Sequence, residues 1–574
     1  MVSKKKQRAY YKARSSNKTK DWNHYKRLKK YVQMESRKAH NTYVNNIIAS
    51  DESGSDKRFF TYVKSRRCDS SGVSPLNHNG VSHSSSKQKA EILNNQFSSV
   101  FTKEDKGTLP SLGPSPYASI PDINITVPGI SKLLSRLNPH KATGPDNIPS
   151  RLLKEAGDQL APALTLLFNA SLIQHRIPTA WSKAFITPIF KKGERSKPSN
   201  YRPVSLTCIA SKILEHVLHS HIMSHLDKHN ILSPYQHGFR KNRSCETQLL
   251  VTIHDLASGL KDGKQMDAIL LDFSKAFDKV PHERLLLKLD HYGIRGDILD
   301  WINQFLTNRT QQVVLEGEKS SHADVTSGVP QGTVLGPLLF LLYINDLPSK
   351  ASSTTRLFAD DCLMYRQINN SDDARQLQAD LDAMEEWERT WLMSFNPDKC
   401  EVLRITNKRL HIINTTYTIH GQPLSIVDSA KYLGVTISSK LTWKEHITTK
   451  IKKANSTRAF LQRNLRAAPI HVKTKAYNTF IRPSVEYCST VWSPHQKDLI
   501  KKLEGVQRRS ARFVMGDYRQ TSSVTSMLNH LQWESLEERR LRAKLTMVYK
   551  IMSGLVAIPF ATPYFLTTTS HTTI

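Results

Sequence analysis

The four residues Phe358-Ala359-Asp360-Asp361 constrain this chain more than any other stretch. They stand between two apolar runs, Leu357-Phe358-Ala359 and Cys362-Leu363-Met364-Tyr365. This order predicts a tight β-hairpin with the two acids at its tip. Adjacent carboxylates on an apolar base repel one another and lose hydration, and a hard divalent cation such as Mg²⁺ relieves both penalties. An exposed Asp-Asp turn is the alternative at this point, because Asp is common in turns.

Length and charge limit the classes of protein that the chain can belong to. Its 574 residues are too many for one hydrophobic core and predict two to four domains. The 82 Lys and Arg against 50 Asp and Glu give a formal charge of +32, which favours a polyanionic partner and above all nucleic acid. No membrane is expected as a partner, because the longest apolar run, Leu338–Ile344, is too short to span a bilayer.

Two features predict an intracellular protein of the nucleus and the cytoplasm. The first residues, Met1-Val2-Ser3-Lys4-Lys5-Lys6, lack the apolar core of a secretory signal, and Lys4–Arg8 is typical of a nuclear address. The six cysteines include no Cys-x-x-Cys pair, which favours reduced thiols and argues against a zinc knuckle.

The ends of the chain differ in composition from its middle. Residues 1–102 are predicted to form a basic, mainly helical segment, with a loop over residues 69–86, and residues 103–124, rich in Pro, Gly and Ser, form a linker. Aromatic residues interleave with the Lys and Arg of the first segment, which favours an arm that binds RNA or DNA phosphates over a solvated basic helix. Residues 531–574 are predicted to be a C-terminal helix and a disordered tail.

Two further stretches carry candidate chemistry. The run Ala268–Phe273 is a buried type of strand that ends on Asp272, and an acid that projects past a sheet is well placed to bind a metal. A helix N-cap is the alternative role for Asp272. Gly328–Gly332 is a glycine-rich turn before an apolar helix that is predicted over Leu335–Leu347.

Three stretches follow one another in a characteristic order, namely Leu271–Asp278, Ser327–Pro337 and Phe358–Asp361. They resemble motifs A, B and C of a reverse transcriptase, and the best match is the LINE-type, non-LTR retrotransposon class of the jockey-like sort. Further stretches look like that class's finger motifs and its motifs D and E: Ile186–Gly193, Asn200–Leu206 and Gln236–Arg240, then Phe395–Lys399 and Tyr432–Gly434.

Periodicity alone predicts only a mixed α+β fold. The resemblance implies a right-hand polymerase, with fingers and palm over residues 125–438 and a helical thumb over residues 439–530. The palm would be an antiparallel sheet backed by helices. The thumb region alternates apolar and basic positions at helical spacing, which suits a surface that holds a template–primer duplex by its backbone.

The resemblance also implies a two-metal centre. Asp272 and Asp360 would bridge two Mg²⁺ ions, with Mn²⁺ as an alternative, and Asp361 would complete or support the site. Lys399 would protonate the pyrophosphate leaving group. The alternative is that Lys399 is an ordinary surface lysine without a catalytic role.

The same resemblance implies residues for the nucleotide and the primer. Phe277 stands at the position of the family's sugar gate, where a bulky ring would exclude a ribose 2′-hydroxyl, and ordinary core packing is the alternative. The other candidates are Arg240 and Lys191 or Lys192 for the triphosphate, Gln331 and Gly332 for the nucleotide sugar or the template, and Tyr432, Leu433 and Gly434 for the primer end.

The expected function is RNA-directed DNA synthesis, with an RNA template, a DNA primer or target and dNTPs as partners and the element RNA bound as a ribonucleoprotein. An RNA-binding remnant without activity and a maturase-like or telomerase-like protein of the same fold are the alternatives. Elements of this class usually also encode an endonuclease, for which residues 1–124 offer no room, so we expect a truncated copy or a fragment of a larger element protein.

Overall fold

Two units make up the structure. This computed structural model describes residues 2–49, 57–67, 72–105, 107, 109–466 and 468–558. The larger unit comprises Gly72–Thr442 with Val548–Ile574, and the smaller unit joins Met1–Ser71 to Trp443–Met547. The expected disordered tail, residues 567–574, lies outside the described residues.

A five-stranded sheet in the larger unit positions the predicted acids. Its strand order is β14-β11-β5-β10-β9, and all neighbours are antiparallel except β11 and β14, which are parallel. Both faces of β5 are buried, which explains why it reads as an unbroken apolar run in the sequence. The strands are β5 (Gln265–Asp272), β9 (Thr354–Phe358), β10 (Asp361–Ile368), β11 (Glu401–Ile405) and β14 (Ser425–Val427).

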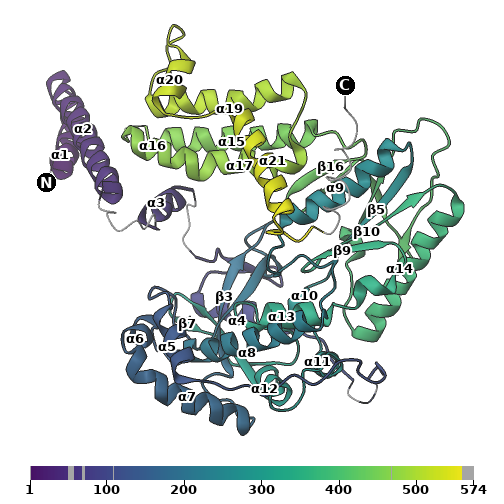
Figure 1. Cartoon of the computed structure of the whole chain (residues 1–574). Helices are drawn as coiled ribbons and strands as arrows, with labels where there is room; N and C mark the ends of the chain where they lie inside the picture. The colour runs from purple at the N-terminus through teal and green to yellow at the C-terminus, as the bar shows by residue number, and fades with distance from the viewer. Residues whose placement is uncertain are drawn as a thin grey trace. The chain divides into compact units, whose positions relative to one another are not determined.

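Helices cover both faces of this sheet. Ile269 and Leu271 of β5 belong to the large core that also contains residues of α13 and α14. Helix α9 packs against β5 on the opposite face of the sheet (Figure 1). In Figure 1, the strands β5, β9 and β10 lie between α9 and α14. The helices are α9 (Cys245–Lys261), α13 (Leu335–Tyr343) and α14 (Ser371–Trp391).

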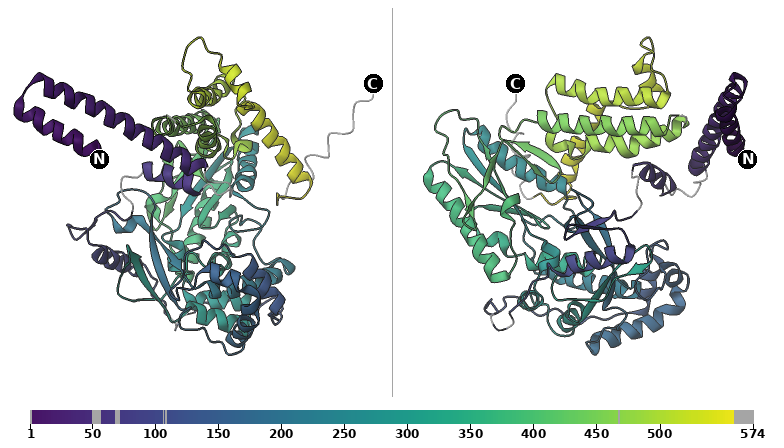
Figure 2. Two further views of the ribbon diagram at one scale, coloured as in Figure 1. Left: turned by 90° about the vertical axis from the view of Figure 1, so that its left-hand side faces the viewer. Right: turned by 180° about the vertical axis from the view of Figure 1, so that it is seen from behind.

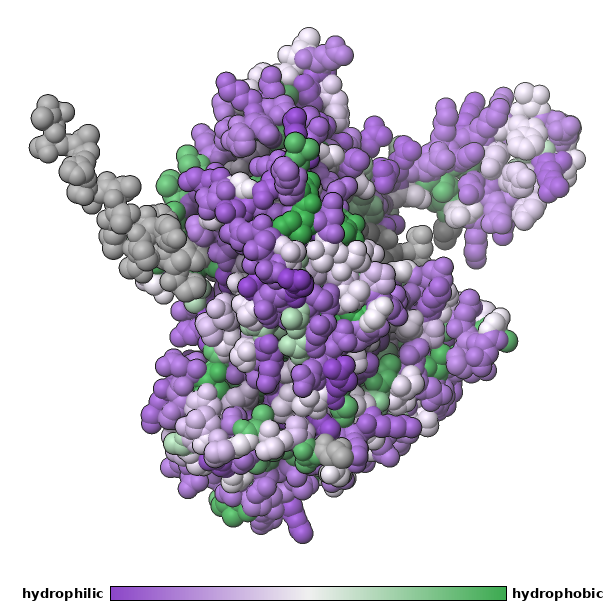
Figure 3. Space-filling view, turned by 90° about the vertical axis from the view of Figure 1, so that its right-hand side faces the viewer, coloured by the Kyte–Doolittle hydropathy of each residue, from purple (hydrophilic) through white to green (hydrophobic). Residues whose placement is uncertain are grey.

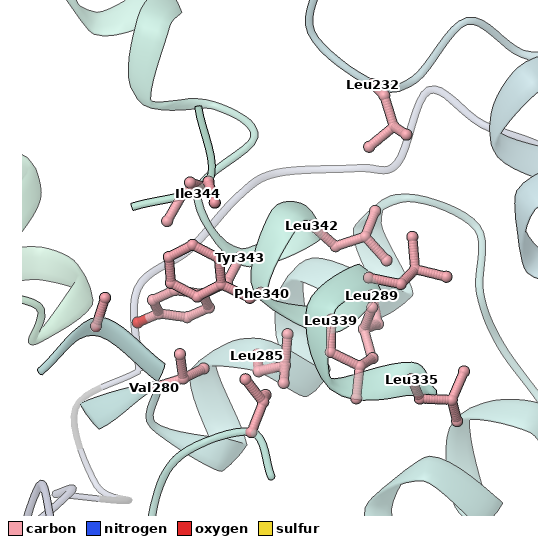
Figure 4. Packing of buried hydrophobic residues seen from close by; sticks show 14 of the residues in the cluster. Leu232, Val280, Leu285, Leu289, Leu335, Leu339, Phe340, Leu342, Tyr343 and Ile344 are labelled. Carbon is pink, nitrogen blue, oxygen red and sulfur yellow. The ribbon is translucent and has the colours of Figure 1, made fainter. Parts of the chain in front are cut away.

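Helix α13 lies at the centre of the main core. All of its residues except Pro337 are buried, and Figure 4 shows Leu335, Leu339 and Phe340 beside Leu285 and Leu289 of α11 (His282–His291). A helix that is apolar on every side is expected in a core. It was predicted over Leu335–Leu347 but ends at Tyr343, and a 3₁₀ turn over Leu347–Lys350 follows.

A second sheet in the larger unit contains residues of two of the stretches that look like finger motifs, Ile186–Gly193 and Asn200–Leu206. Its order is β4-β3-β6-β7, with β8 also paired to β6, and β3 runs parallel to β6. The stretch Ile186–Gly193 begins in β3 and runs into the loop that follows this strand. The strands are β3 (Lys183–Phe190), β4 (Tyr201–Leu206), β6 (Arg309–Leu315), β7 (Glu318–Lys319) and β8 (Ala323–Val325). The helices around it are α5 (Val127–Ser135), α6 (Ser150–Glu155), α7 (Gly157–Ile173), α8 (Ile209–Lys228), α10 (Ala276–Lys279) and α12 (Asp297–Leu306).

Residues 72–102 fold with the larger unit, so the boundary predicted at residue 102 differs from the one after Ser71 in the structure. Helix α4 (Ser86–Ser98) packs on β6, because Leu93 and Phe97 share a core with Val313. The loop predicted over residues 69–86 is wrong for residues 76–83, which form the hairpin of β1 (Leu76–His78) and β2 (Val81–His83). Its turn, Asn79-Gly80, has φ angles of 50° and 79°, typical of a type I′ turn.

The smaller unit is helical, as predicted. In its N-terminal part, α1 and α2 lie side by side, and Figure 2 shows this pair from the side. The rings of Tyr10, Trp22 and Tyr25 contact one another at centroid distances of 5.3–6.2 Å. The helices are α1 (Val2–Ser16), α2 (Thr19–Ala49), α3 (Lys57–Arg67), α15 (Lys444–Asn464), α16 (Ile470–Ala476), α17 (Arg482–Glu486), α18 (Ser489–Trp492), α19 (Lys497–Met515), α20 (Val524–His530) and most of α21 (Leu536–Met552), with a π-helical turn at Tyr477–Ile481.

The surface agrees with the polar composition of the chain. Hydrophilic residues cover most of the face in Figure 3, and hydrophobic residues form small patches between them. Within the described ranges, no helix combines the length and the apolar character that crossing a membrane requires.

Candidate active site

The β9–β10 hairpin positions the two adjacent acids, as predicted. Phe358 pairs with Asp361, which leaves Ala359 and Asp360 as a two-residue turn. Ala359 has a φ of +53°, a conformation that residues other than Gly rarely adopt. Asp360 therefore lies at the tip of the hairpin, and Asp361 is the first residue of β10.

Strand β5 brings the third acid to the same edge of the sheet. In the antiparallel register of β5 and β10, Asp272 lies directly opposite Asp361. Residues opposed in this way have Cα atoms about 4.5–5.5 Å apart and side chains on one face of the sheet. Asp272 is the last residue of β5, so all three acids gather where the two strands meet the hairpin turn.

The charges of Asp272 and Asp360 act on the third acid. The pKa of Asp361 is raised to about 6, chiefly by burial and then by the carboxylates of Asp360 and Asp272, while Lys191 and Arg202 oppose this rise. Within the part of the chain that the structure describes, no three His, Cys, Asp or Glu side chains are grouped closely enough to enclose a metal ion. The carboxylate of Asp272 is instead turned toward Lys399, whose Nζ donates a hydrogen bond of 2.6 Å to Oδ2.

These observations fit a divalent cation. Like charges that raise one another's pKa are relieved by a cation between them, and carboxylate oxygens are the ligands that Mg²⁺ prefers. The strand register brings the backbones of Asp272 and Asp361 together and sets their side chains on one face of the sheet. The donor set is therefore suited to Mg²⁺ or Mn²⁺.

Two cations lie beside the acids. Lys191 is an exposed residue overall, but its amine is partly desolvated, and its pKa is lowered by burial and by Arg202 and Lys399 while Asp272 and Asp360 raise it. Arg202, on β4, acts on the pKa of Asp361 as well. Arg202 belongs to the motif stretch Asn200–Leu206, but the resemblance implies no role for it, and an arginine in a strand gives no local sign of such a role. Lys192 is exposed in the same loop as Lys191.

The loop after β8 and the turn that carries Phe277 are joined by hydrogen bonds. Val329 N donates to Phe277 O at 2.8 Å, and Gly328 N donates to Val280 O at 2.7 Å. The ring of Phe277 stacks on Phe340 of α13 with centroids 4.3 Å apart, and the side chain is only partly buried. Phe277 therefore packs against the core, and its ring stays partly exposed.

Gln331 and Gly332 belong to the same loop. Gln331 Nε2 donates a hydrogen bond of 3.1 Å to Oδ1 of Asp278, a residue to which the sequence pattern gave no role. Gly332 has a φ of +102°, and a Cβ on it would lie 2.7 Å from the carbonyl oxygen of Ser205. Only glycine lets the loop approach β4 this closely.

The burial of Asp278 leads to a prediction about stability and pH. Burial raises the pKa of Asp278 to about 6, against the partial compensation by Lys275, Gln331 and Arg202. Because the folded state holds this proton more tightly than the unfolded state, ionisation removes stability as the pH rises from about 4 to about 6. An Asn at this position never ionises and still accepts the hydrogen bond from Gln331. We therefore expect Asp278→Asn to raise the free energy of unfolding at pH 8 by about 1–3 kcal/mol, and to change it little at about pH 3, below the unfolded pKa.

Denaturant unfolding of both proteins at the two pH values measures this difference. A variant that is less stable than the wild type at pH 8 would contradict the assignment of a raised pKa to Asp278.

Arg240 faces its own loop. Its Nη1 donates to the carbonyl oxygens of Ser233 at 2.8 Å and Leu232 at 3.3 Å, and burial lowers its pKa. The structure therefore gives Arg240 partners in the backbone, and it is Arg202 whose charge lowers the pKa of Asp361.

The predicted primer-grip residues form the turn between β15 (Ser429–Tyr432) and β16 (Val435–Ser438). Tyr432 is buried, its hydroxyl accepts a hydrogen bond of 3.0 Å from Gln248 Nε2, and burial raises its pKa. Leu433 and Gly434 have φ angles of 44° and 84°, so the turn is of the type I′ class. The buried phenol of Tyr432 thus anchors the β15–β16 hairpin, whereas the turn residues Leu433 and Gly434 are only half-buried.

Taken together, three carboxylates lie at one edge of the sheet, and two cations, Lys191 and Arg202, lie within electrostatic reach of them. Such a site is suited to bind divalent ions with a polyphosphate, because the acids hold the ions and the cations offset the phosphate charge.

Comparison with known proteins agrees with this chemistry. Residues 189–437 match the family described as "Reverse transcriptase (RNA-dependent DNA polymerase)". The RNA-directed DNA polymerase from mobile element jockey of Drosophila melanogaster is 28% identical over 418 residues, which cover 70% of this chain and 45% of the relative. The jockey polymerase of Drosophila funebris is 29% identical over 414 residues, which cover 69% and 44%. The Pol polyprotein from the type-1 retrotransposable element R2 of Popillia japonica is 29% identical over 248 residues, or 39% and 38%. The chain thus spans less than half the length of these relatives.

Proposed function

We propose that the chain is the RNA-directed DNA polymerase of a non-LTR retrotransposon, because residues 189–437 match the reverse transcriptase family. It would add dNTPs to a DNA primer on an RNA template. The observation that carries the proposal is the register of β5 and β10, which sets Asp272 opposite Asp361 beside the turn that holds Asp360.

The proposed centre uses the three acids as ligands. Asp272, Asp360 and Asp361 would hold two Mg²⁺ or Mn²⁺ ions, which supply charge stabilisation for the attacking and leaving oxygens of phosphoryl transfer. Lys191 and Arg202 would neutralise the triphosphate, with Lys192 in the same loop. Lys399 would give a proton to the departing pyrophosphate, since its Nζ already lies 2.6 Å from Asp272 Oδ2.

The parts of a right-hand polymerase can be assigned within each unit. The five-stranded sheet with α13 and α14 would be the palm, and the sheet of β3, β4 and β6 with its helices would be the fingers. The helices from α15 to α19 would be the thumb, and their Lys and Arg residues suit an RNA–DNA duplex held by its backbone. The basic helices α1 and α2 would bind the element RNA in a ribonucleoprotein.

Phe277 is proposed to select deoxynucleotides. If its ring excludes a 2′-hydroxyl, Phe277→Ala should raise the ratio of ribonucleotide to deoxynucleotide incorporation by about 10²-fold, which corresponds to ~3 kcal/mol of lost discrimination. Single-nucleotide extension with rNTP and dNTP measures this ratio. Phe340→Leu is the matched control, because it disturbs the same ring stack and keeps the Phe277 ring. An unchanged ratio in Phe277→Ala would remove the gate role.

Primer extension on poly(rA)/oligo(dT) with Mg²⁺ or Mn²⁺ tests the proposed function directly. We expect the full chain to incorporate dTTP and to require the divalent ion. A chain that binds the template–primer tightly without extending it under either ion would overturn the proposal.

A further inference from the structure

The segment Tyr235–Gly238 lies against the hairpin that carries the acids. Leu357 N donates a hydrogen bond of 3.0 Å to Tyr235 O, and His237 N donates one of 2.9 Å to Leu357 O. Gln236 therefore forms a parallel bridge with Leu357, next to the edge of β9. These two backbone hydrogen bonds hold the segment beside the residues that lead into the hairpin turn.

One side chain of this segment reaches the turn itself. Oε1 of Gln236 accepts a hydrogen bond of 2.9 Å from Ala359 N and another of 2.7 Å from Gly238 N. The residue is 2% exposed, so water does not compete for these bonds. Because both partners are N–H donors, the carboxamide oxygen must face them, and the orientation of the amide is settled by its surroundings.

The turn needs such a partner. Ala359 holds a φ of +53°, which persists in residues other than Gly only where the surroundings impose it. Gly238 fits closely against the same residue, since a Cβ on it would lie 2.3 Å from Ala359 N. The backbone just before Asp360 is thus held by the hydrogen bond that Ala359 N donates to Gln236 and by close packing against Gly238.

We propose that Gln236 is a positioning residue for the metal-binding acids. By accepting the N–H of Ala359, it keeps the strained turn in the one conformation that presents Asp360 and Asp361 together. This inference rests on the proposed function for the role of the acids, but the hydrogen bonds themselves do not depend on it. When a residue that orients a metal ligand without itself binding the metal is replaced, metal affinity or activity typically falls by about 10–100-fold.

Three variants of the full chain test the proposal. Gln236→Met keeps the length of the side chain and removes the acceptor, whereas Gln236→Glu keeps two acceptor oxygens. Gln265→Met is the matched control, because Gln265 is equally buried, accepts Ile413 N at 3.0 Å, and lies at the opposite end of β5 from Asp272.

Three readouts separate a positioning role from a general structural one. For Gln236→Met we expect primer extension to slow by about 10–100-fold, Mn²⁺ alone to bind about tenfold more weakly, and the amides of residues 358–361 to exchange hydrogen faster. The affinity for template–primer should stay within about twofold of the wild type, and Gln236→Glu should recover extension to within about threefold.

Two results would overturn the inference. One is Mn²⁺ binding and hydrogen exchange in Gln236→Met that match those of Gln265→Met. The other is an equal loss of template–primer binding and extension in both Met variants, which would indicate damage to the fold as a whole. If the wild type did not extend primers at all, the proposed function would fail, and the Mn²⁺ and exchange measurements would still decide the role of Gln236.

Discussion

Conversion of Asp360 to Asn is expected to abolish primer extension. Asp360 lies at the tip of the β9–β10 hairpin, beside the opposed pair of Asp272 and Asp361. An amide has the shape of the carboxylate but not its charge, so the proposed metal centre would lose one ligand charge. Metal ions contribute several kcal/mol of transition-state stabilisation to such reactions, and ~4 kcal/mol corresponds to a rate loss of about 10³-fold. Extension of a labelled primer on poly(rA)/oligo(dT) measures the loss.

Binding of template–primer to Asp360→Asn should change by less than about twofold, because the thumb and the basic helices are proposed to carry it. The matched control is Asp382→Asn, which removes one negative charge from an exposed position on α14. The control should extend primers at the wild-type rate. Extension by Asp360→Asn at a rate close to that of the control would remove Asp360 from the active site.

Replacement of Lys288 by Met is expected to destabilise the larger unit by about 3–5 kcal/mol. The side chain is 1% exposed, and its Nζ donates to Asp346 Oδ1 at 2.5 Å and to Tyr343 O at 2.6 Å. The rings of Tyr343, Trp387 and Trp391 surround the amine at 3.7–5.0 Å. Burial lowers its pKa to about 8, so the amine is still mainly charged at pH 7. Met fills much of the volume but leaves the carboxylate of Asp346 without its cation.

Denaturant unfolding followed by tryptophan fluorescence measures this change, since two of the rings around Lys288 are tryptophans. Lys154→Met, at an exposed position on α6, is the control and should shift the free energy of unfolding by less than about 0.5 kcal/mol. A Lys288→Met protein as stable as the control would show that the buried ion pair makes no net contribution to the free energy of unfolding.

Local patterns predicted many elements of the fold because they depend on near neighbours in the chain. The alternation of apolar and acidic residues predicted the β9–β10 hairpin, and the apolar run before Asp272 predicted β5. The loop predicted over residues 69–86 failed at β1 and β2, where the Asn79-Gly80 signal for a hairpin was present but short. The helix predicted to reach Leu347 ends earlier, because its C-terminal limit depends on packing in the core.

The candidate site was predicted only in part. The resemblance pointed to Asp272, Asp360 and Asp361, and the strand register brings them together. It also pointed to Arg240, whose guanidinium has backbone carbonyls as partners instead. Arg202 was not assigned a role, because an arginine in a strand gives no local sign of what lies across the sheet from it.

The chain's own sequence determined which kinds of chemistry are available: adjacent acids at a turn, an acid at the end of a buried strand, basic loops, and a large positive charge. Only the tertiary structure decided which of these groups meet. The opposition of Asp272 and Asp361, the hold of Gln236 on Ala359 and the burial of Lys288 among three rings all join segments that are distant in sequence. Such contacts follow from strand register and core packing. Both depend on the whole fold, so the sequence around each residue does not predict them.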